Sequence, residues 1–232
     1  VSRQRRSRRD RERRRFRLRM NGRRIGVFGG AFDPPHIGHL VVAQDVIEAL
    51  GLDLLLIVPS ARPPHRDAVL DAEQRLALVR TVFDDDPRIE VSDIELRRPG
   101  PSWTVDTLEE IRRRWKPDEL VLVIGADQYR SFDSWRDPPR ILELAELAVM
   151  PRDGELPRED PRYPFVAAPV TRVDVSSTRV RDRLSTGRSV RYLVPGSIRE
   201  RLEEIWSERE VGAEANASSV PTGLEKDATD GC

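Results

Sequence analysis

Short apolar runs alternate with amphipathic stretches along most of this 232-residue chain. Each apolar run is bounded by turn residues and is short enough for one strand, and each amphipathic stretch repeats its apolar residues at helical spacing. Because strand and helix alternate, the pattern predicts a doubly wound α/β fold, a parallel sheet with helices on both faces. The expected strands are residues 25–28, 54–58, 89–91, 120–124 and 147–150, and the expected helices are residues 40–50, 72–83, 104–115 and 139–144.

The pattern changes after residue 150. Residues 151–164 are rich in proline and charge, which predicts a loop. The elements expected after this loop are two short strands at 165–167 and 172–175 and two helices at 177–187 and 195–206. The expected organisation is an arginine-rich disordered tail or mis-annotated start at residues 1–19, one folded domain at 20–210 and a disordered polar tail at 211–232.

The amino-terminal segment has a strong charge bias. The whole chain has a formal charge of zero, yet residues 1–19 contain eleven arginines against only Asp10 and Glu12. A segment with so little apolar content cannot bury enough surface to fold alone. It could bind nucleic acid or simply be solvated, and Met20 suggests a third interpretation, that translation starts there. Arginine outnumbers lysine throughout the chain, and a genome-wide coding bias can produce such an excess without any selection for nucleic-acid contact. We therefore favour the two interpretations without a nucleic-acid partner, a disordered tail or a mis-annotated start.

Cysteine content and hydropathy bear on the compartment. The single cysteine, Cys232, can form neither an internal disulfide nor a cysteine metal cluster, which predicts a reducing compartment, the cytoplasm. No apolar run approaches the roughly 20 residues that a membrane-spanning helix needs, so we expect no membrane partner. The sequence leaves homo-oligomerisation open.

A glycine pair and two histidines follow the first expected strand. Gly29 and Gly30 predict a turn whose backbone can approach a ligand closely, and His36 and His39 share one face of the helix that follows. The unpaired N–H groups and positive dipole end of a helix start suit a phosphate. A tight turn with helix-capping histidines is the alternative, but it explains poorly why prolines surround them.

Two segments together resemble a known superfamily. Residues 30–39, G-A-F-D-P-P-H-I-G-H, resemble the G-x-F-D-P-x-H-x-G-H signature of the nucleotidyltransferases, and residues 176–181, S-S-T-R-V-R, resemble their second motif, S-S-T-x-[IV]-R. Read alone, the second segment indicates an ordinary helix N-cap. The resemblance implies a Rossmann-like sheet on which the two helix starts converge across one crevice. It implies His36, His39 and Arg181 as catalytic residues and an ATP site made of Gly29, Gly30, Phe32, His36, His39, Gly125, Asp127, Ser176, Ser177, Thr178 and Arg181.

Further segments resemble the nicotinate mononucleotide adenylyltransferase branch of this superfamily. They are residues 59 and 63–66, 100–108, 124–127, 132 and 135, and 192–195. The resemblance implies a nicotinate-nucleotide site made of Arg66, Ser102, Trp103, Thr104 and Trp135. Arg66 stands where the branch usually has lysine, and Trp103 where it usually has tyrosine.

Several of these residues also have an ordinary structural interpretation. Thr104 could be a helix cap with Trp103 packed in the core, and Trp135 could be buried packing. Asp127 could be a helix cap or an acceptor for ribose hydroxyls. The residues alone leave these alternatives open.

The resemblance implies a reaction, the transfer of an adenylyl group from ATP to nicotinate mononucleotide. Nicotinate adenine dinucleotide (deamido-NAD) and pyrophosphate would be the products, in NAD biosynthesis. The acceptor phosphate is already anionic, so alignment and charge neutralisation would suffice, with Mg²⁺ carried mainly by ATP and no metal site on the protein itself. Nicotinamide mononucleotide and pantetheine phosphate are rival acceptors. A zinc hydrolase with His36, His39 and His65 as ligands, or a nucleic-acid-binding protein, are alternatives from other classes.

Overall fold

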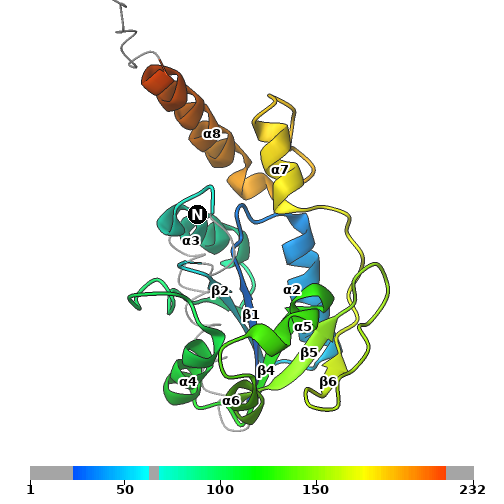
Figure 1. The fold of residues 1–232 in the computed structure, drawn as a ribbon. Coiled ribbons are helices and arrows are strands. Elements are labelled where there is room, and N and C mark those ends of the chain that lie inside the picture. The colour runs from blue at the N-terminus through cyan, green and yellow to red at the C-terminus, as the bar shows by residue number, and fades with distance from the viewer. Residues whose placement is uncertain (1–22, 63–67, 218–232) are drawn as a thin grey trace, which may run out of the picture.

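A six-stranded parallel sheet forms the centre of the computed structural model, which describes residues 23–62 and 68–217 and, of these, the side chains up to residue 209 (Figure 1). The strands lie in the order β3-β2-β1-β4-β5-β6. All neighbouring pairs are parallel. Five strands contain the predicted apolar runs, because strands buried on both faces are apolar throughout. The strands are β1 (Arg24–Gly30), β2 (Leu54–Pro59), β3 (Ile89–Val91), β4 (Glu119–Gly125), β5 (Glu146–Met150) and β6 (Phe165–Ala167).

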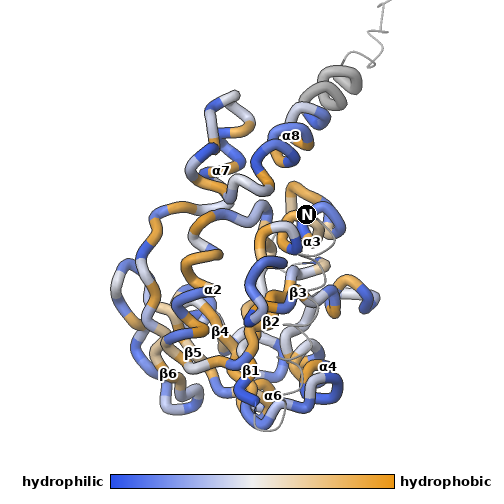
Figure 2. The backbone as a smooth tube through the Cα atoms, turned by 180° about the vertical axis from the view of Figure 1, so that it is seen from behind, coloured by the Kyte–Doolittle hydropathy of each residue, from blue (hydrophilic) through white to orange (hydrophobic). Residues whose placement is uncertain are grey.

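Helices cover both faces of the sheet. Val46 and Val79, from α2 and α3, pack in one apolar cluster, and Ile111 and Ile141, from α4 and α6, pack in the cluster on the other face. Viewed by hydropathy, the central strands are mostly hydrophobic (Figure 2). This arrangement confirms the doubly wound α/β prediction. The helices between strands are α2 (Ile37–Ala49), α3 (Ala72–Phe83), α4 (Thr104–Trp115), α5 (Ala126–Arg130), the 3₁₀ turn η1 (Phe132–Ser134) and α6 (Pro138–Leu144).

A third apolar cluster joins α3 to the two last helices, α7 (Ser177–Leu184) and α8 (Gly196–Ala217). Leu78 of α3 belongs to this cluster together with Val180 of α7 and Leu202 of α8. The cluster holds α7 near the carboxyl end of β1 and the start of α2 (Figure 1). Within residues 23–62 and 68–217, no helix combines the length and the apolarity needed to cross a bilayer.

The structure corrects three boundaries that the sequence predicts. Gly29 and Gly30 form no turn, because they continue β1 and pair with Val58 and Pro59 of β2. Residues 172–175 form no strand, because the chain there has left the sheet edge at β6 to reach α7. The last helix continues past residue 206 to Ala217, so residues 211–217 are helical rather than the start of a polar tail.

Other differences lie at helix starts and outside the described residues. α2 begins at Ile37 rather than at residue 40, since His36 already occupies the N-cap position. α5 and η1 are not predicted, because elements of five and three residues are too short to show a helical period. The predictions for residues 1–19 and for 218–232 fall outside the described part of the chain.

The central position of β2 leads to a stability prediction. Leu56 is fully buried (0% exposed) in the core cluster that contains α4 and α6, whereas Leu156 is 44% exposed. Leu56→Ala should lower the free energy of unfolding by about 3 kcal/mol, because it removes buried methyl groups and leaves a cavity. Leu156→Ala is the matched control and should change it by less than about 0.5 kcal/mol. Urea unfolding measures both, and equal effects would contradict this placement of the core.

Candidate active site

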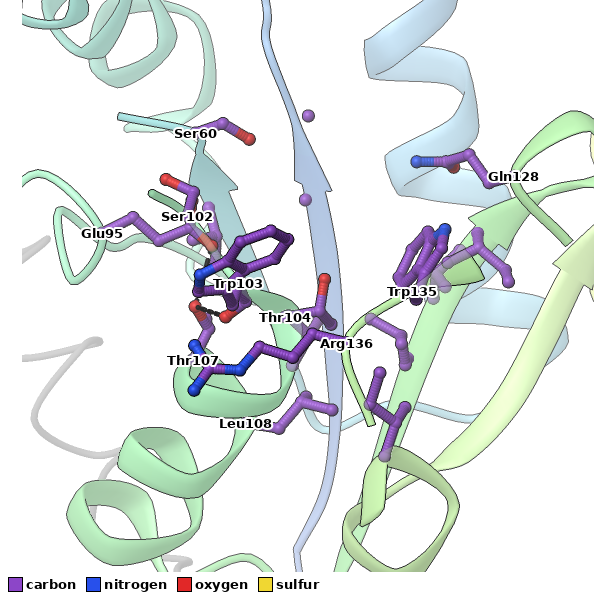
Figure 3. Close-up of a pocket in the computed structure, with 18 of the residues that line it drawn as sticks. Ser60, Glu95, Ser102, Trp103, Thr104, Thr107, Leu108, Gln128, Trp135 and Arg136 are labelled. Atoms are coloured by element: carbon purple, nitrogen blue, oxygen red, sulfur yellow. Dashed lines mark hydrogen bonds between the residues drawn. The ribbon is translucent and has the colours of Figure 1, made fainter. Parts of the chain in front are cut away.

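The strand order reverses its crossover direction between β1 and β4, and a cavity of about 260 Å³ lies there at the carboxyl ends of the strands. In an open α/β sheet this switch point is where ligands bind. Figure 3 shows Trp103 and Trp135 on opposite sides of the cavity, with Thr104 between them and Arg136 and Leu108 below. The residues that line it include Gly29, Gly30, Ala31, Ser60, Glu95, Ser102, Trp103, Thr104, Thr107, Leu108, Ile124, Gln128, Ser131, Trp135, Arg136 and Ile141.

The two histidines form a compact pair at the start of α2. His36 is the N-cap residue and is only 7% exposed, and its ring centroid lies 3.8 Å from that of His39. The backbone N–H of His36 donates to His39 Nδ1 at 3.1 Å, so a neutral His39 carries its proton on Nε2. Phe32 is buried and packs against His39 with a centroid separation of 4.8 Å. The pair therefore has a fixed orientation before any ligand binds.

Burial controls the charge of this pair. Desolvation lowers the pKa of His36 from 6.5 to about 4. Desolvation, followed by the proximity of His36, holds the pKa of His39 well below its usual range. Both imidazoles are therefore neutral near pH 7 in the free protein, and each has one N–H to donate. An anion at this point would favour protonation and oppose the shift.

The start of α7 directly contacts residues 33–39, which we call the histidine turn. The hydroxyl of Ser177 donates to the carbonyl oxygen of Pro34 at 2.9 Å, across 143 residues of sequence. Arg181 Nη1 donates to the carbonyl oxygen of Asp33 at 2.6 Å and lies 3.6 Å from that residue's Oδ2. These contacts confirm that the two motif segments converge.

The hydroxyls of α7 are used differently from the phosphate cradle that the sequence suggests. Ser176 Oγ accepts the backbone N–H of Arg179 as a helix cap (3.2 Å), and Thr178 Oγ1 accepts from Arg181 Nη2 (3.2 Å). Together with the Ser177 contact, they hold the helix start and the Arg181 side chain in place. The partly exposed Arg181 guanidinium has further N–H groups to offer an anion.

Aromatic side chains form the walls of the cavity. Trp103 is the N-cap residue of α4, and the guanidinium carbon of Arg136 lies 5.7 Å from its ring centroid. Trp135 packs on Phe132 with a centroid separation of 5.3 Å. Both tryptophans are partly buried against the core and also face the cavity, so the core and ligand interpretations of these residues are compatible. A flat ring could lie between them.

Ser102 and Thr107 form hydrogen bonds with the buried carboxyl group of Glu95. Ser102 Oγ accepts the backbone N–H groups of Ala61 at 3.1 Å and Arg62 at 3.3 Å. Thr107 Oγ1 donates to Glu95 Oε1 at 2.8 Å. Burial raises the pKa of the Glu95 carboxyl, and hydrogen bonds from Ser102 and Thr107 oppose that shift. Ser102 therefore holds the loop after β2, a use that the sequence does not indicate.

Of the predicted site residues that the structure describes, six line the cavity: Gly29, Gly30, Ser102, Trp103, Thr104 and Trp135. Arg66 falls outside the described residues, as does His65. Gly125 ends β4, and its N–H donates to Gln128 Oε1 at 2.9 Å. Asp127 is exposed and pairs with Arg130 and Arg152 at 2.6 and 2.8 Å. Neither Gly125 nor Asp127 lines the cavity, whereas Gln128 does.

The sequence-based prediction lacks two buried charged residues at the cavity, Glu95 in its lining and Arg75 behind it. Glu95 lies in a charged stretch that resembles a solvated loop, so the sequence carries no local signal for its burial. Arg75 is 1% exposed and lies behind the cavity wall. A signal existed for Arg75, because it lies three and four residues before Leu78 and Val79, on the apolar side of α3.

Comparison with known proteins places the chain in a family. The model of the cytidylyltransferase-like family matches residues 27–183, and the chain belongs to this family. A Thermus thermophilus protein named "Probable nicotinate-nucleotide adenylyltransferase" is 47% identical over 181 residues, which are 78% of this chain and 97% of the relative. A protein of the same name from Gemmatimonas aurantiaca is 44% identical over 185 residues, 75% of this chain and 87% of the relative.

A solved structure shows the same fold. It is described as Plasmodium falciparum nicotinic acid mononucleotide adenylyltransferase complexed with NaAD, and it matches with a TM-score of 0.65 at 14% identity. The match covers 81% of this chain and 96% of that one. At this identity the likeness supports the doubly wound architecture alone.

The low pKa of His36 predicts a pH dependence of stability. Because the unfolded histidine titrates at 6.5 and the folded one at about 4, acidification from pH 6.5 to 4 protonates the unfolded state first and lowers the free energy of unfolding. The loss from this residue is at most about 3 kcal/mol. His36→Asn, which keeps an N-cap side chain, should show a shallower decline in urea unfolding across this pH range. Parallel curves for the two proteins would contradict the burial argument.

Proposed function

We propose that this protein transfers the adenylyl group of ATP to nicotinate mononucleotide, giving nicotinate adenine dinucleotide and pyrophosphate in NAD biosynthesis. The main support is the direct contact between the histidine turn and the start of α7, beside a cavity with aromatic walls. The names of the curated relatives, which align over most of their length, support the same reaction.

In the proposed reaction, a phosphate oxygen of the mononucleotide attacks the α-phosphorus of ATP. A P–O bond forms there while the bond to the bridging oxygen of the β-phosphate breaks, and that oxygen leaves with pyrophosphate. No proton has to be removed from the nucleophile, because the phosphate is anionic near neutral pH. Catalysis then consists of alignment and of neutralising the charge on the phosphates.

His36, His39 and Arg181 are the proposed catalytic groups. The fixed His39 Nε2–H and the His36 imidazole would donate to phosphate oxygens, and Arg181 would hold the departing pyrophosphate. Burial strengthens these hydrogen bonds because the site has a lower dielectric constant than water. As the imidazoles meet the negative charge of the nucleotide, their pKa values would rise from the low values of the free protein.

Mg²⁺ is proposed to arrive on ATP. In residues 23–62 and 68–217, no three His, Cys, Asp or Glu side chains gather as a protein metal site would require. Phosphate oxygens and water are good Mg²⁺ ligands and would supply most of its coordination. The ion would add positive charge to the triphosphate.

The pyridine ring is proposed to lie between Trp103 and Trp135. The backbone N–H groups at the start of α4, beside Thr104, favour the negative carboxylate of nicotinate over a neutral amide. Since Ser102 Oγ already accepts two backbone N–H groups, the main chain and Thr104 are better placed than Ser102 to select the carboxylate. The cytoplasm is the proposed compartment on the cysteine argument, and homo-oligomerisation stays open.

The acceptor can be identified with purified protein, ATP and Mg²⁺. Pyrophosphate release should be at least about tenfold faster in kcat/KM with nicotinate mononucleotide than with nicotinamide mononucleotide, because only the former carries the carboxylate. Pantetheine phosphate should give no release, since it has no ring to stack between the tryptophans. Preference for either rival acceptor would overturn the proposed substrate.

The phosphate-binding roles can be tested by truncation. His36→Ala and His39→Ala should each lower kcat by about 10²- to 10³-fold, because each removes a donor to a charge that develops in the transition state. Arg181→Ala should have a similar effect. Arg183→Ala is its matched control on the same helix, because Arg183 Nε donates to the Ser189 carbonyl oxygen at 2.7 Å instead of facing Asp33. Full turnover in either histidine variant would contradict these assignments.

A further inference from the structure

Arg75 of α3 is a buried cation whose hydrogen bonds all go to main-chain carbonyls. Its Nη1 donates to Ala31 and Ser60, both at 2.7 Å, its Nη2 to Ala61 at 3.2 Å and its Nε to Leu70 at 3.2 Å. Ala31 and Ser60 follow β1 and β2 directly and line the cavity. One guanidinium therefore joins the carboxyl ends of two neighbouring strands just behind the cavity wall.

Ser102 binds two of these peptide groups, those after Ser60 and Ala61, from their opposite edge. The carbonyls of Ser60 and Ala61 point to Arg75, and the N–H groups of the same two peptides, on Ala61 and Arg62, donate to Ser102 Oγ. This follows because the C=O and N–H of a trans peptide point in opposite directions. The two peptides after β2 are thus held between α3 and the residue that precedes Trp103.

Glu95 completes this arrangement on the far side of Ser102. Its pKa responds to hydrogen bonds from Ser102 and Thr107, and Thr107 is in the first turns of α4. Arg75, the two peptides, Ser102 and Glu95 together form what we call the polar brace. It extends from α3 to α4 under one wall of the cavity.

The desolvation cost of burying Arg75 indicates that this side chain has a specific use. Taking a guanidinium out of water carries a large desolvation penalty, and an apolar side chain of similar size would fill the space at lower cost. Desolvation lowers the pKa of Arg75, and the charges of Asp33, Asp71 and Glu95 oppose that shift without removing the cost. An apolar residue, however, could not donate hydrogen bonds to four carbonyl groups as Arg75 does.

We propose that Arg75 is a positioning residue for the pyridine nucleotide, acting through the polar brace to hold the Trp103 wall at its distance from the end of β1. This proposal rests on the proposed function. It predicts that loosening the brace weakens the mononucleotide site, while ATP, which is bound by the histidine turn and α7, is affected less. A general loss of folding would weaken both sites equally.

The test compares Arg75→Lys with Arg80→Lys, an exposed arginine of the same helix that pairs with Asp93 at 3.0 Å. Lysine keeps the charge of Arg75 but has a single nitrogen, which cannot reach four carbonyls. Arg75→Lys should raise KM for nicotinate mononucleotide about tenfold and KM for ATP less than about threefold. Arg80→Lys should leave both unchanged. Equal rises in the two KM values for Arg75→Lys would overturn the proposal.

Ser102→Ala gives a second, independent readout. It removes the other hold on the same peptides, so the double variant with Arg75→Lys should cost less in kcat/KM than the product of the two single effects. Full additivity would contradict a shared brace. If Arg75→Lys does not fold, Ser102→Ala alone must still raise KM for the mononucleotide selectively, and an unselective effect overturns the proposal.

Binding of nicotinate mononucleotide, followed by quenching of tryptophan fluorescence, separates this proposal from the proposed function. Wild-type protein that binds the mononucleotide without transferring an adenylyl group contradicts the reaction only, and selective weakening in Arg75→Lys then still supports the brace. Wild-type protein that neither binds nor transfers overturns both.

Discussion

In a parallel sheet, each connection must return from the carboxyl end of one strand to the amino end of the next. In this protein the returns leave β1 and β4 toward opposite faces. α2 and α5 therefore diverge from neighbouring strands, and the backbone at the carboxyl ends of β1 and β4 is left uncovered. The rest of the site depends on these uncovered strand ends. The segments that follow β1, β2 and β4, together with the start of α4, form the walls of the cavity around them.

The two halves of the site are built from different interactions. On the side of α7, the contacts are hydrogen bonds from Ser177 and Arg181 to main-chain oxygens of the histidine turn. On the side of α4, aromatic rings form the walls and the polar brace lies behind them. In both halves the contacts that join separate elements include hydrogen bonds to backbone groups, so the spacing of the elements depends on the rigid main chain as well as on side chains. A bond-forming reaction between two bound nucleotides needs this kind of fixed spacing.

Buried polar groups are concentrated around the cavity. His36 and His39 are neutral in the free protein, and burial raises the pKa of Glu95. Arg75 donates its hydrogen bonds to main-chain carbonyl groups. Each of these burials disfavours the charged form of the group. In exchange, their hydrogen bonds act in a medium that screens them poorly, so a few donors can organise a highly charged ligand.

Most of the fold follows from patterns a few residues long. The apolar runs of β2 and β4 predict buried strands, and the spacing of apolar residues predicts α3 and α4, because these signals depend only on near neighbours. The same local logic fails at Gly29 and Gly30, which resemble a turn but pair with Val58 and Pro59 once β2 lies beside them. It fails again at residues 172–175, where alternation imitates a strand that has no sheet edge to join.

The sequence by itself determined the strands, most of the helices and the two motif segments, since these are written in local order and composition. Only the tertiary structure decided that Ser177 meets Pro34 across 143 residues, that Asp127 points to Arg130 and Arg152 rather than into the cavity, and that Ser102 holds a loop. It also decided that Arg75 and Glu95 are buried. The physical reason is that burial and long-range hydrogen bonds depend on which surfaces are brought together, and a charged residue looks the same in the chain whether it later faces water or four carbonyl groups.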